Sequence, residues 1–86
     1  MKLRKHKDTY LLPPFSRIEQ VGLSERGFHY AMMRVGEATM GEMKKVGGVG
    51  RPCYYTILGK KIVIQPMPAR GGADLVVYYS PPIKIA

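Results

Sequence analysis

The sequence predicts an α+β fold that is mainly β: a small twisted antiparallel sheet, or an open barrel or sandwich, with one short helix packed on it and extended termini. Two observations lead to this prediction. Residues 50–82 contain three runs rich in β-branched and aromatic side chains, which glycines and prolines separate. Residues 36–45 are the one stretch with the features of a helix. A length of 86 residues favours a single folded domain.

Composition divides the chain into a basic N-terminal arm at residues 1–10, a β-rich domain at residues 11–82 and a C-terminal tail at residues 83–86. The first nine residues hold four lysines and arginines and little that is apolar. Such a segment is typical of an arm that extends from a domain rather than packing on it. We therefore expect the fold to begin near residue 11.

Three elements are expected between the arm and the helix. Residues 15–21 alternate in polarity and predict an edge strand. Residues 22–27, which begin and end with glycine, are expected to form a turn. Residues 28–35 are apolar enough for a buried strand, and a helix is the alternative interpretation of this run.

The helix prediction at residues 36–45 rests on the order of charges and on the residue that follows. Acidic side chains come early and basic ones late, which is the order that the helix dipole favours. Gly47 is well placed to end the helix with a positive φ. Met40 and Met43 are three residues apart, so they share a face that can lie on the sheet.

Residues 53–58 and 61–65 predict a β-hairpin around Gly59 and Lys60, because a two-residue loop with glycine first suits a type II′ turn. This turn fixes the register, which places Ile57 and Tyr55 opposite two isoleucines on one face. Cys53 is expected at the end of that face as a small core residue. A third strand follows at residues 74–80. The predicted core comprises Tyr55, Ile57, Ile62, Ile64, Leu75, Val77, Met40 and Met43.

The sequence lacks the residue patterns of catalytic and metal sites. His6 and His29 have no serine or cysteine that the sequence places beside them, and together with Cys53 they do not form a spaced ligand set. A glycine-rich stretch at residues 47–50 lacks the Lys-Ser/Thr pair of a phosphate-binding loop. We therefore expect a protein that is not an enzyme and has no cofactor and no metal. No signal peptide or membrane span is expected.

The charge indicates an anionic partner. The chain has 14 basic and 6 acidic residues, a formal net charge of +8. Two partners stay open for the arm: the phosphates of duplex DNA, or an acidic groove on a neighbouring protein. The second is favoured, because Leu3 and Tyr10 supply apolar anchors that phosphate does not require. The candidate contacts are Lys2, Arg4, Lys5 and Lys7.

Several motifs appear in a fixed order. The hairpin region reads GRP-x-YY-x-I-x-G-x-x-I-x-I-x-P-x-P, the third strand ends YY-x-PP, and LPPFSRI stands upstream at residues 12–18. In this order and spacing the motifs resemble the head-to-tail adaptor (connector, or neck) proteins of tailed bacteriophages. The expected helix falls where that family has a short one. The resemblance covers residues 11–82.

The resemblance implies a structural virion protein of the neck or tail, assembled in the host cytoplasm. It would form a homo-oligomeric ring, dodecameric as in that family, below the portal protein and above tail or nozzle proteins. Double-stranded DNA would pass through the ring and meet it non-specifically, and no membrane is involved. The helices that flank the family's β-region are missing or reduced here, so either this is a minimal version of the family or other chains supply their contacts. The candidate oligomer or partner contacts are Arg70, Ile83 and Ile85.

A second interpretation is a small basic β-domain that binds single-stranded nucleic acid by stacking and charge. Against it, neighbouring tyrosines of a strand point to opposite faces, so half of them are expected in the core. The residues that this interpretation requires on one surface are Tyr54, Tyr55, Tyr78, Tyr79, Lys60, Lys61 and Arg70.

Overall fold

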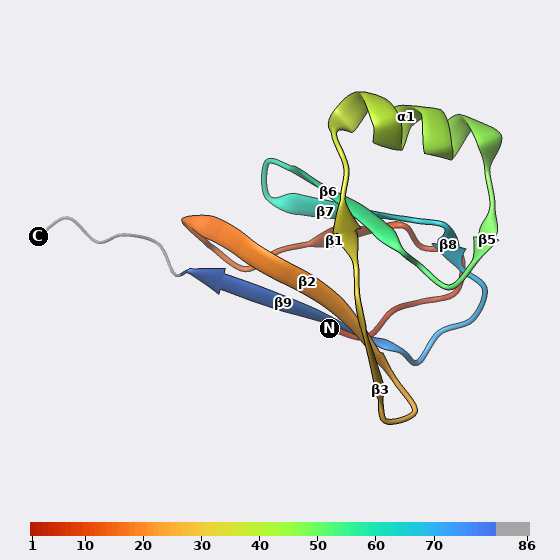
Figure 1. Cartoon of the computed structure of the whole chain (residues 1–86), viewed down its shortest axis with the longest axis horizontal. Helices are drawn as coiled ribbons and strands as arrows, with labels where there is room; N and C mark the ends of the chain where they lie inside the picture. The colour runs from red at the N-terminus through yellow and green to blue at the C-terminus, as the bar shows by residue number, and fades with distance from the viewer. Residues whose placement is uncertain (81–86) are drawn as a thin grey trace, which may run out of the picture.

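The structure, a computed structural model, describes residues 1–80 and has the predicted mainly β fold with one helix (Figure 1). The tail residues Ile83 and Ile85 lie outside the described part. The elements are β1 (Thr9–Leu11), β2 (Arg17–Glu25), β3 (Phe28–Ala31), β4 (Met33–Arg34), α1 (Glu37–Val46), β5 (Val49–Gly50), β6 (Tyr54–Leu58), β7 (Lys61–Gln65), β8 (Met67–Pro68) and β9 (Asp74–Ser80). Strands join as β1-β7-β6-β4, β3-β2-β9 and β5-β8, and these sheets do not close into a barrel.

The β6–β7 hairpin has the predicted register. Ile57 lies opposite Ile62, and Tyr55 lies opposite Ile64. Gly59 has a φ of 60°, which the first loop position of a type II′ turn requires and which glycine adopts without steric cost. The alternation along both strands is therefore set by a local turn.

The hairpin is the middle of three layers (Figure 1). On one side its apolar face packs against β2 and β9, and this main core contains Tyr55, Ile62, Ile64 and Leu75 as predicted. Ile57 and Val77 are half-buried at its margin. The third predicted strand is β9, which belongs to the second sheet and not to the hairpin's own.

Helix α1 covers the other face of the hairpin. It contacts both β6 and β7, and its Met40 is buried outside the main core, as is Val63 of β7. Met43 is half-buried. Gly47 follows the helix with a φ of 71°, and its N–H donates to the carbonyl of Met43 at 3.2 Å, so it ends the helix as predicted. Within residues 1–80, no helix has the length and apolar character to cross a membrane.

The predictions for residues 15–35 are wrong in detail. The expected edge strand is instead β2, the central strand of its sheet, and it runs through the expected turn to Glu25. The reason lies at Gly22, where a β-carbon would approach the carbonyl oxygen of Tyr30 to 3.1 Å. Gly22 thus allows close pairing of β2 with β3, and the turn itself is only Arg26 and Gly27.

The expected buried strand at residues 28–35 is two short strands with a break at Met32. The Met32 N–H donates to the carbonyl of Val21 in one sheet at 3.0 Å, and the Met33 N–H donates to the carbonyl of Cys53 at 2.9 Å, beside the other. Met32 is buried where the chain crosses between sheets, while Phe28 and Met33 are exposed. Strands β3 and β4 are edge strands of their sheets, so apolar residues in this run are less buried than their hydrophobicity predicts.

Cys53 is exposed, which contradicts its predicted place in the core. Strand β6 begins one residue later, at Tyr54, and the buried residue of the preceding bend is Pro52. The Cys53 thiol lies 3.3 Å from the carbonyl oxygen of Arg51. The alternation of the strand therefore does not extend to Cys53.

Candidate functional site

The N-terminal segment, residues 1–8, packs on the domain, so the prediction of an unpacked arm is wrong. The Leu3 side chain is only 2% exposed and belongs to the main core. The Leu3 N–H donates to the carbonyl of Ala73 at 2.8 Å, and the Gly72 N–H donates to the carbonyl of Leu3 at 3.1 Å. Met1 exchanges backbone hydrogen bonds with Leu75 at the start of β9. The apolar residues of the segment thus anchor it to its own chain.

Tyr10 holds the second half of this segment. Its ring is buried opposite Ile62 in the β1–β7 pairing. Its hydroxyl donates to the carbonyl of Lys7 at 2.8 Å and accepts from the N–H of Arg4 at 2.9 Å. The Lys7 ammonium lies 5.1 Å from the centre of the same ring. Residues 4–7 therefore bend around a buried tyrosine and present their charges outward.

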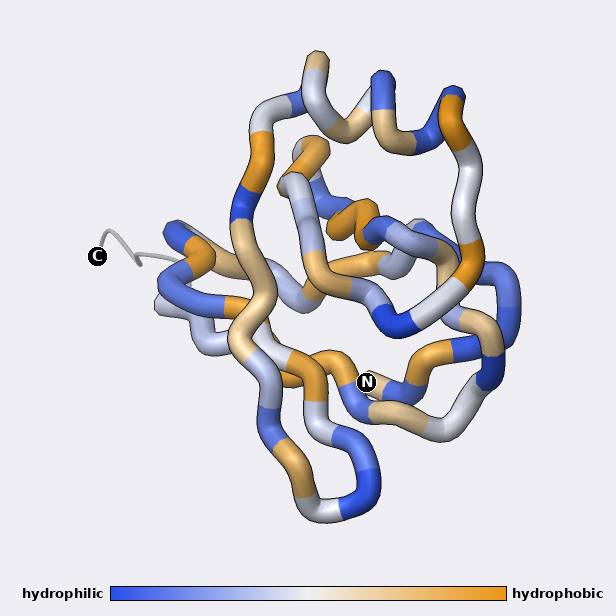
Figure 2. Tube along the Cα trace, turned by 45° about the vertical axis from the view of Figure 1, so that its right-hand side comes forward, coloured by the Kyte–Doolittle hydropathy of each residue, from blue (hydrophilic) through white to orange (hydrophobic). Residues whose placement is uncertain are grey.

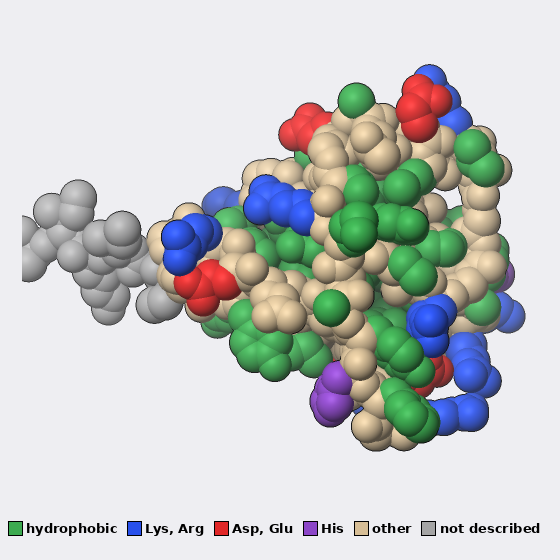
Figure 3. Space-filling model, viewed as in Figure 1, with side chains coloured by type: hydrophobic (Ala, Val, Ile, Leu, Met, Phe, Trp, Pro, Cys, Tyr) green, Lys and Arg blue, Asp and Glu red, His purple; other side chains and the backbone are tan. Residues whose placement is uncertain are grey.

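This packing brings separate basic residues to one end of the molecule. A β-carbon on Gly71 would lie 3.6 Å from backbone atoms of Arg4 and of Lys5, so the loop that carries Arg70 runs against them. Arg70 and Arg51 line the same hollow of about 370 Å³. Hydrophilic stretches and lysine or arginine side chains gather at this end (Figures 2 and 3). We call Arg4, Lys5, Lys7, Arg51 and Arg70 the basic surface.

Few acidic groups neutralise the basic surface. Arg70 pairs with Glu25 at 3.4 Å, and the nearby Lys2 pairs with Asp74 at 3.4 Å. Both pairs lie at the solvent-accessible surface and stabilise the fold little. For Arg4, Lys5, Lys7 and Arg51, no acidic group of residues 1–80 lies within ion-pair distance. The result is a positive surface suited to a polyanion.

Arg51 and Tyr30 are the residues that sequence reasoning missed. The Arg51 guanidinium lies over the Tyr30 ring, 4.1 Å from its centre, and Phe28 stacks against Tyr30 with a centroid distance of 6.5 Å. An arginine before a proline is too common to single out Arg51. Only the packing of β3 against the bend at residues 51–53 shows that it joins the basic surface.

The tyrosines of the alternative interpretation do not form one platform. Tyr55 is buried, and Tyr54 lies in a different sheet from Tyr78 and Tyr79. Tyr78 and Tyr79 project to opposite faces of β9 because successive side chains of a strand alternate. Lys60 and Lys61 lie at the hairpin turn and are not part of the basic surface. The structure therefore gives no support to stacking by these residues.

Within residues 1–80, no group of three His, Cys, Asp or Glu side chains could hold a metal ion. No protein-family model matches the chain, and a search of curated proteins gives no match. The resemblance to phage adaptors rests on the sequence motifs alone.

Proposed function

We propose that the protein is a structural virion protein of a tailed bacteriophage, a head-to-tail adaptor that forms a ring below the portal and joins capsid to tail. The observation that carries the proposal is the order of its elements. The LPPFSRI motif leads into β2, the short helix α1 follows, the GRP motif leads into the β6–β7 hairpin, and β9 ends at Ser80 before two prolines. This is the order that the resemblance implies for residues 11–82.

The basic surface of such a ring would meet the phosphates of passing DNA. The sequence favoured docking on an acidic protein groove because Leu3 and Tyr10 were available as anchors. Both are buried in the chain's own core, so neither side chain is free to anchor the segment on another protein. The basic groups that remain on the surface suit phosphates, which need no apolar anchors and no fixed groove.

The ring is tested by mass. Light scattering of the purified protein, alone and mixed with portal protein, should give one closed oligomer and a larger complex. A protein that stays monomeric at every concentration and does not bind portal protein would contradict the adaptor proposal.

The DNA contact is tested by its salt dependence. In an Arg4→Ala/Lys5→Ala variant, the slope of log affinity for duplex DNA against log salt should become shallower by about 1.8, at about 0.9 for each phosphate that the variant no longer neutralises. The matched control is Lys60→Ala/Lys61→Ala, which removes the same charge at the hairpin turn and should leave the slope unchanged. Equal slopes in all three proteins would exclude Arg4 and Lys5 as DNA contacts.

A further inference from the structure

An apolar groove lies beside the C-terminal end of α1. Its volume is about 250 Å³, which is below the range of about 300–1,000 Å³ for small-molecule pockets and suits a few side chains of a peptide. The Gln65 side chain of its lining is buried and donates to the Asp8 carboxylate at 3.0 Å, so its amide nitrogen already has a partner. The lining residues are Met43, Val46, Gly47, Gly48, Tyr54, Gln65 and Pro66.

The rim of this groove is unusually apolar for a surface. Val46 is 85% exposed, and Val49 and Tyr54 are also exposed. The exposed Met33 continues the patch, because β4 pairs beside β6 with Met33 opposite Tyr54. Contiguous exposed apolar side chains mark contact sites for other chains more often than isolated ones do. The groove and its rim are therefore a docking surface.

The chain supplies a segment of fitting chemistry. Residues 81–86, with the sequence PPIKIA, follow β9. Two consecutive prolines have no N–H to donate, so a sheet cannot simply continue through them. In an extended segment Ile83 and Ile85 project to the same side and Lys84 to the other. Two isoleucines would enter an apolar groove while the lysine stays in water.

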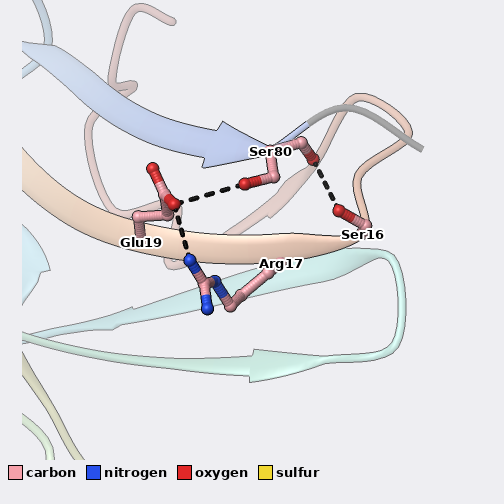
Figure 4. Close-up of polar contacts among 4 residues, drawn as sticks. All are labelled: Ser16, Arg17, Glu19 and Ser80. Carbon is pink, nitrogen blue, oxygen red and sulfur yellow. Dashed lines mark hydrogen bonds and ion pairs between the residues drawn. The ribbon is translucent and has the colours of Figure 1, made fainter. Parts of the chain in front are cut away.

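The end of β9, which precedes this segment in the sequence, is held by several hydrogen bonds. The Ser80 carbonyl accepts from the Ser16 N–H at 2.9 Å and from the Ser16 hydroxyl at 3.3 Å (Figure 4). The Ser80 hydroxyl donates to the Glu19 carboxylate at 3.2 Å, and Arg17 donates to the same oxygen at 2.8 Å. The end of β9 is therefore held to β2.

The end of β9 lies at the opposite end of the molecule from the groove (Figure 1). Strand β9 ends at the left-hand side of this view, whereas the groove adjoins the right-hand end of α1. Because β9 ends away from the groove of its own chain, we take another copy as the receiver of residues 81–86.

We propose that residues 81–86 of one copy occupy the groove beside α1 of the next copy, with Ile83 and Ile85 against Met43, Val46 and Tyr54. Tail and groove are different surfaces, so the contact is heterologous and repeats from copy to copy, and it forms a ring when the rotation between copies closes. This inference deepens the proposed function, on whose ring it rests, by naming the contact between its subunits.

Disulfide trapping tests the contact. The variant carries Val46→Cys and Ile85→Cys, with Cys53→Ser to remove the exposed native thiol. Mild oxidation should give a ladder of covalent oligomers. The matched control replaces Val46→Cys by Leu11→Cys, at a leucine that is 70% exposed on β1, and should give no ladder. A covalently closed monomer would show that each tail fills its own groove, and trapping no better than the control would show that the groove is not the receiver; either result overturns the proposal.

A groove-filling variant tests it without cysteines. A β-carbon at Gly48 would lie 3.9 Å from the Pro66 β-carbon, an ordinary contact, so Gly48→Leu places a side chain in the groove. It should weaken self-association at least tenfold and leave the unfolding midpoint close to that of the wild type. Rings that form normally in Gly48→Leu would overturn the tail contact but leave the adaptor proposal intact. Wild-type protein that never associates would instead remove the ring on which both depend.

Discussion

The two larger sheets differ in how many of their faces are buried. In β7, Ile62, Val63 and Ile64 are all buried in succession, because one face of this strand packs on the main core and the other lies under α1. In β9, burial is one-sided: Leu75 is buried, whereas Tyr78 is 57% exposed. The hairpin sheet is therefore the scaffold of the domain, and the β3-β2-β9 sheet keeps one face open.

The open face has a shape of its own. Gly22 of β2 has no side chain, and a hollow of about 220 Å³ lies here on the β3-β2-β9 sheet. His29 of β3 and Tyr78 of β9 are among its lining residues. Among residues 1–80, the outer edge of β9 is covered only at its start, where Lys2 pairs with Asp74. Sheets with one open face tolerate polar and partner-binding side chains there. The two sheets thus differ in burial: both faces of the hairpin sheet are largely covered, whereas the β3-β2-β9 sheet leaves one face accessible.

The largest effect is expected in the hairpin sheet. Ile62→Ala should lower the free energy of unfolding by about 2–5 kcal/mol, because Ile62 is 0% exposed and its removal leaves a cavity in the main core. Urea unfolding followed by circular dichroism measures it. The matched change in the other sheet, Tyr78→Ser on the open face, should stay within about 0.5 kcal/mol. Equal decreases in both variants would refute this difference in burial between the two sheets.

A smaller effect is expected in the helix layer. Met40→Ala should lower the free energy of unfolding by about 2 kcal/mol, the lower end of the range for a buried methionine. The loss is small because α1 can move toward the sheet and partly fill the cavity. Thermal unfolding measures the decrease in stability. The adjacent exposed position provides the control, because Thr39→Ala removes no buried contact. A Met40→Ala protein as stable as the control would show that the helix contributes little to the scaffold.

The smallest effect concerns the carboxylate at the end of the open sheet. The hydrogen bond from Arg17, then that from Ser80, lowers the pKa of Glu19 below its ordinary value of about 4.5. Because the ionised carboxylate is favoured in the folded state, it stabilises the fold at pH values above the ordinary pKa. This contribution disappears as the pH falls through the folded-state pKa. Glu19→Gln should therefore be slightly less stable than the wild type at pH 7, and the difference should vanish in acid. Arg17→Gln should remove the same pH dependence, and a difference between wild type and Glu19→Gln that persists in acid would contradict this origin.

The sequence by itself determined the elements whose signals are local. The β6–β7 register follows from Gly59 and from strict alternation, the strand at residues 74–80 is bounded by a loop and two prolines, and Gly47 ends the helix. Turn geometry and side-chain period act within a few residues, so a single sequence contains them. The same local features were enough to predict core residues such as Tyr55, Ile62 and Leu75, which the structure buries.

Only the tertiary structure decided which elements meet. The burial of Leu3 and Tyr10 depends on contacts with residues some 50 to 70 positions away. Composition alone does not contain those contacts, so it predicted a free basic arm. A glycine at position 22 indicates a turn by residue type, yet in the structure it allows two strands to approach closely. The basic surface joins residues 4–7 to Arg51 and Arg70 through packing that no local pattern encodes, because long-range contacts depend on how the layers fit and not on the order of neighbouring residues.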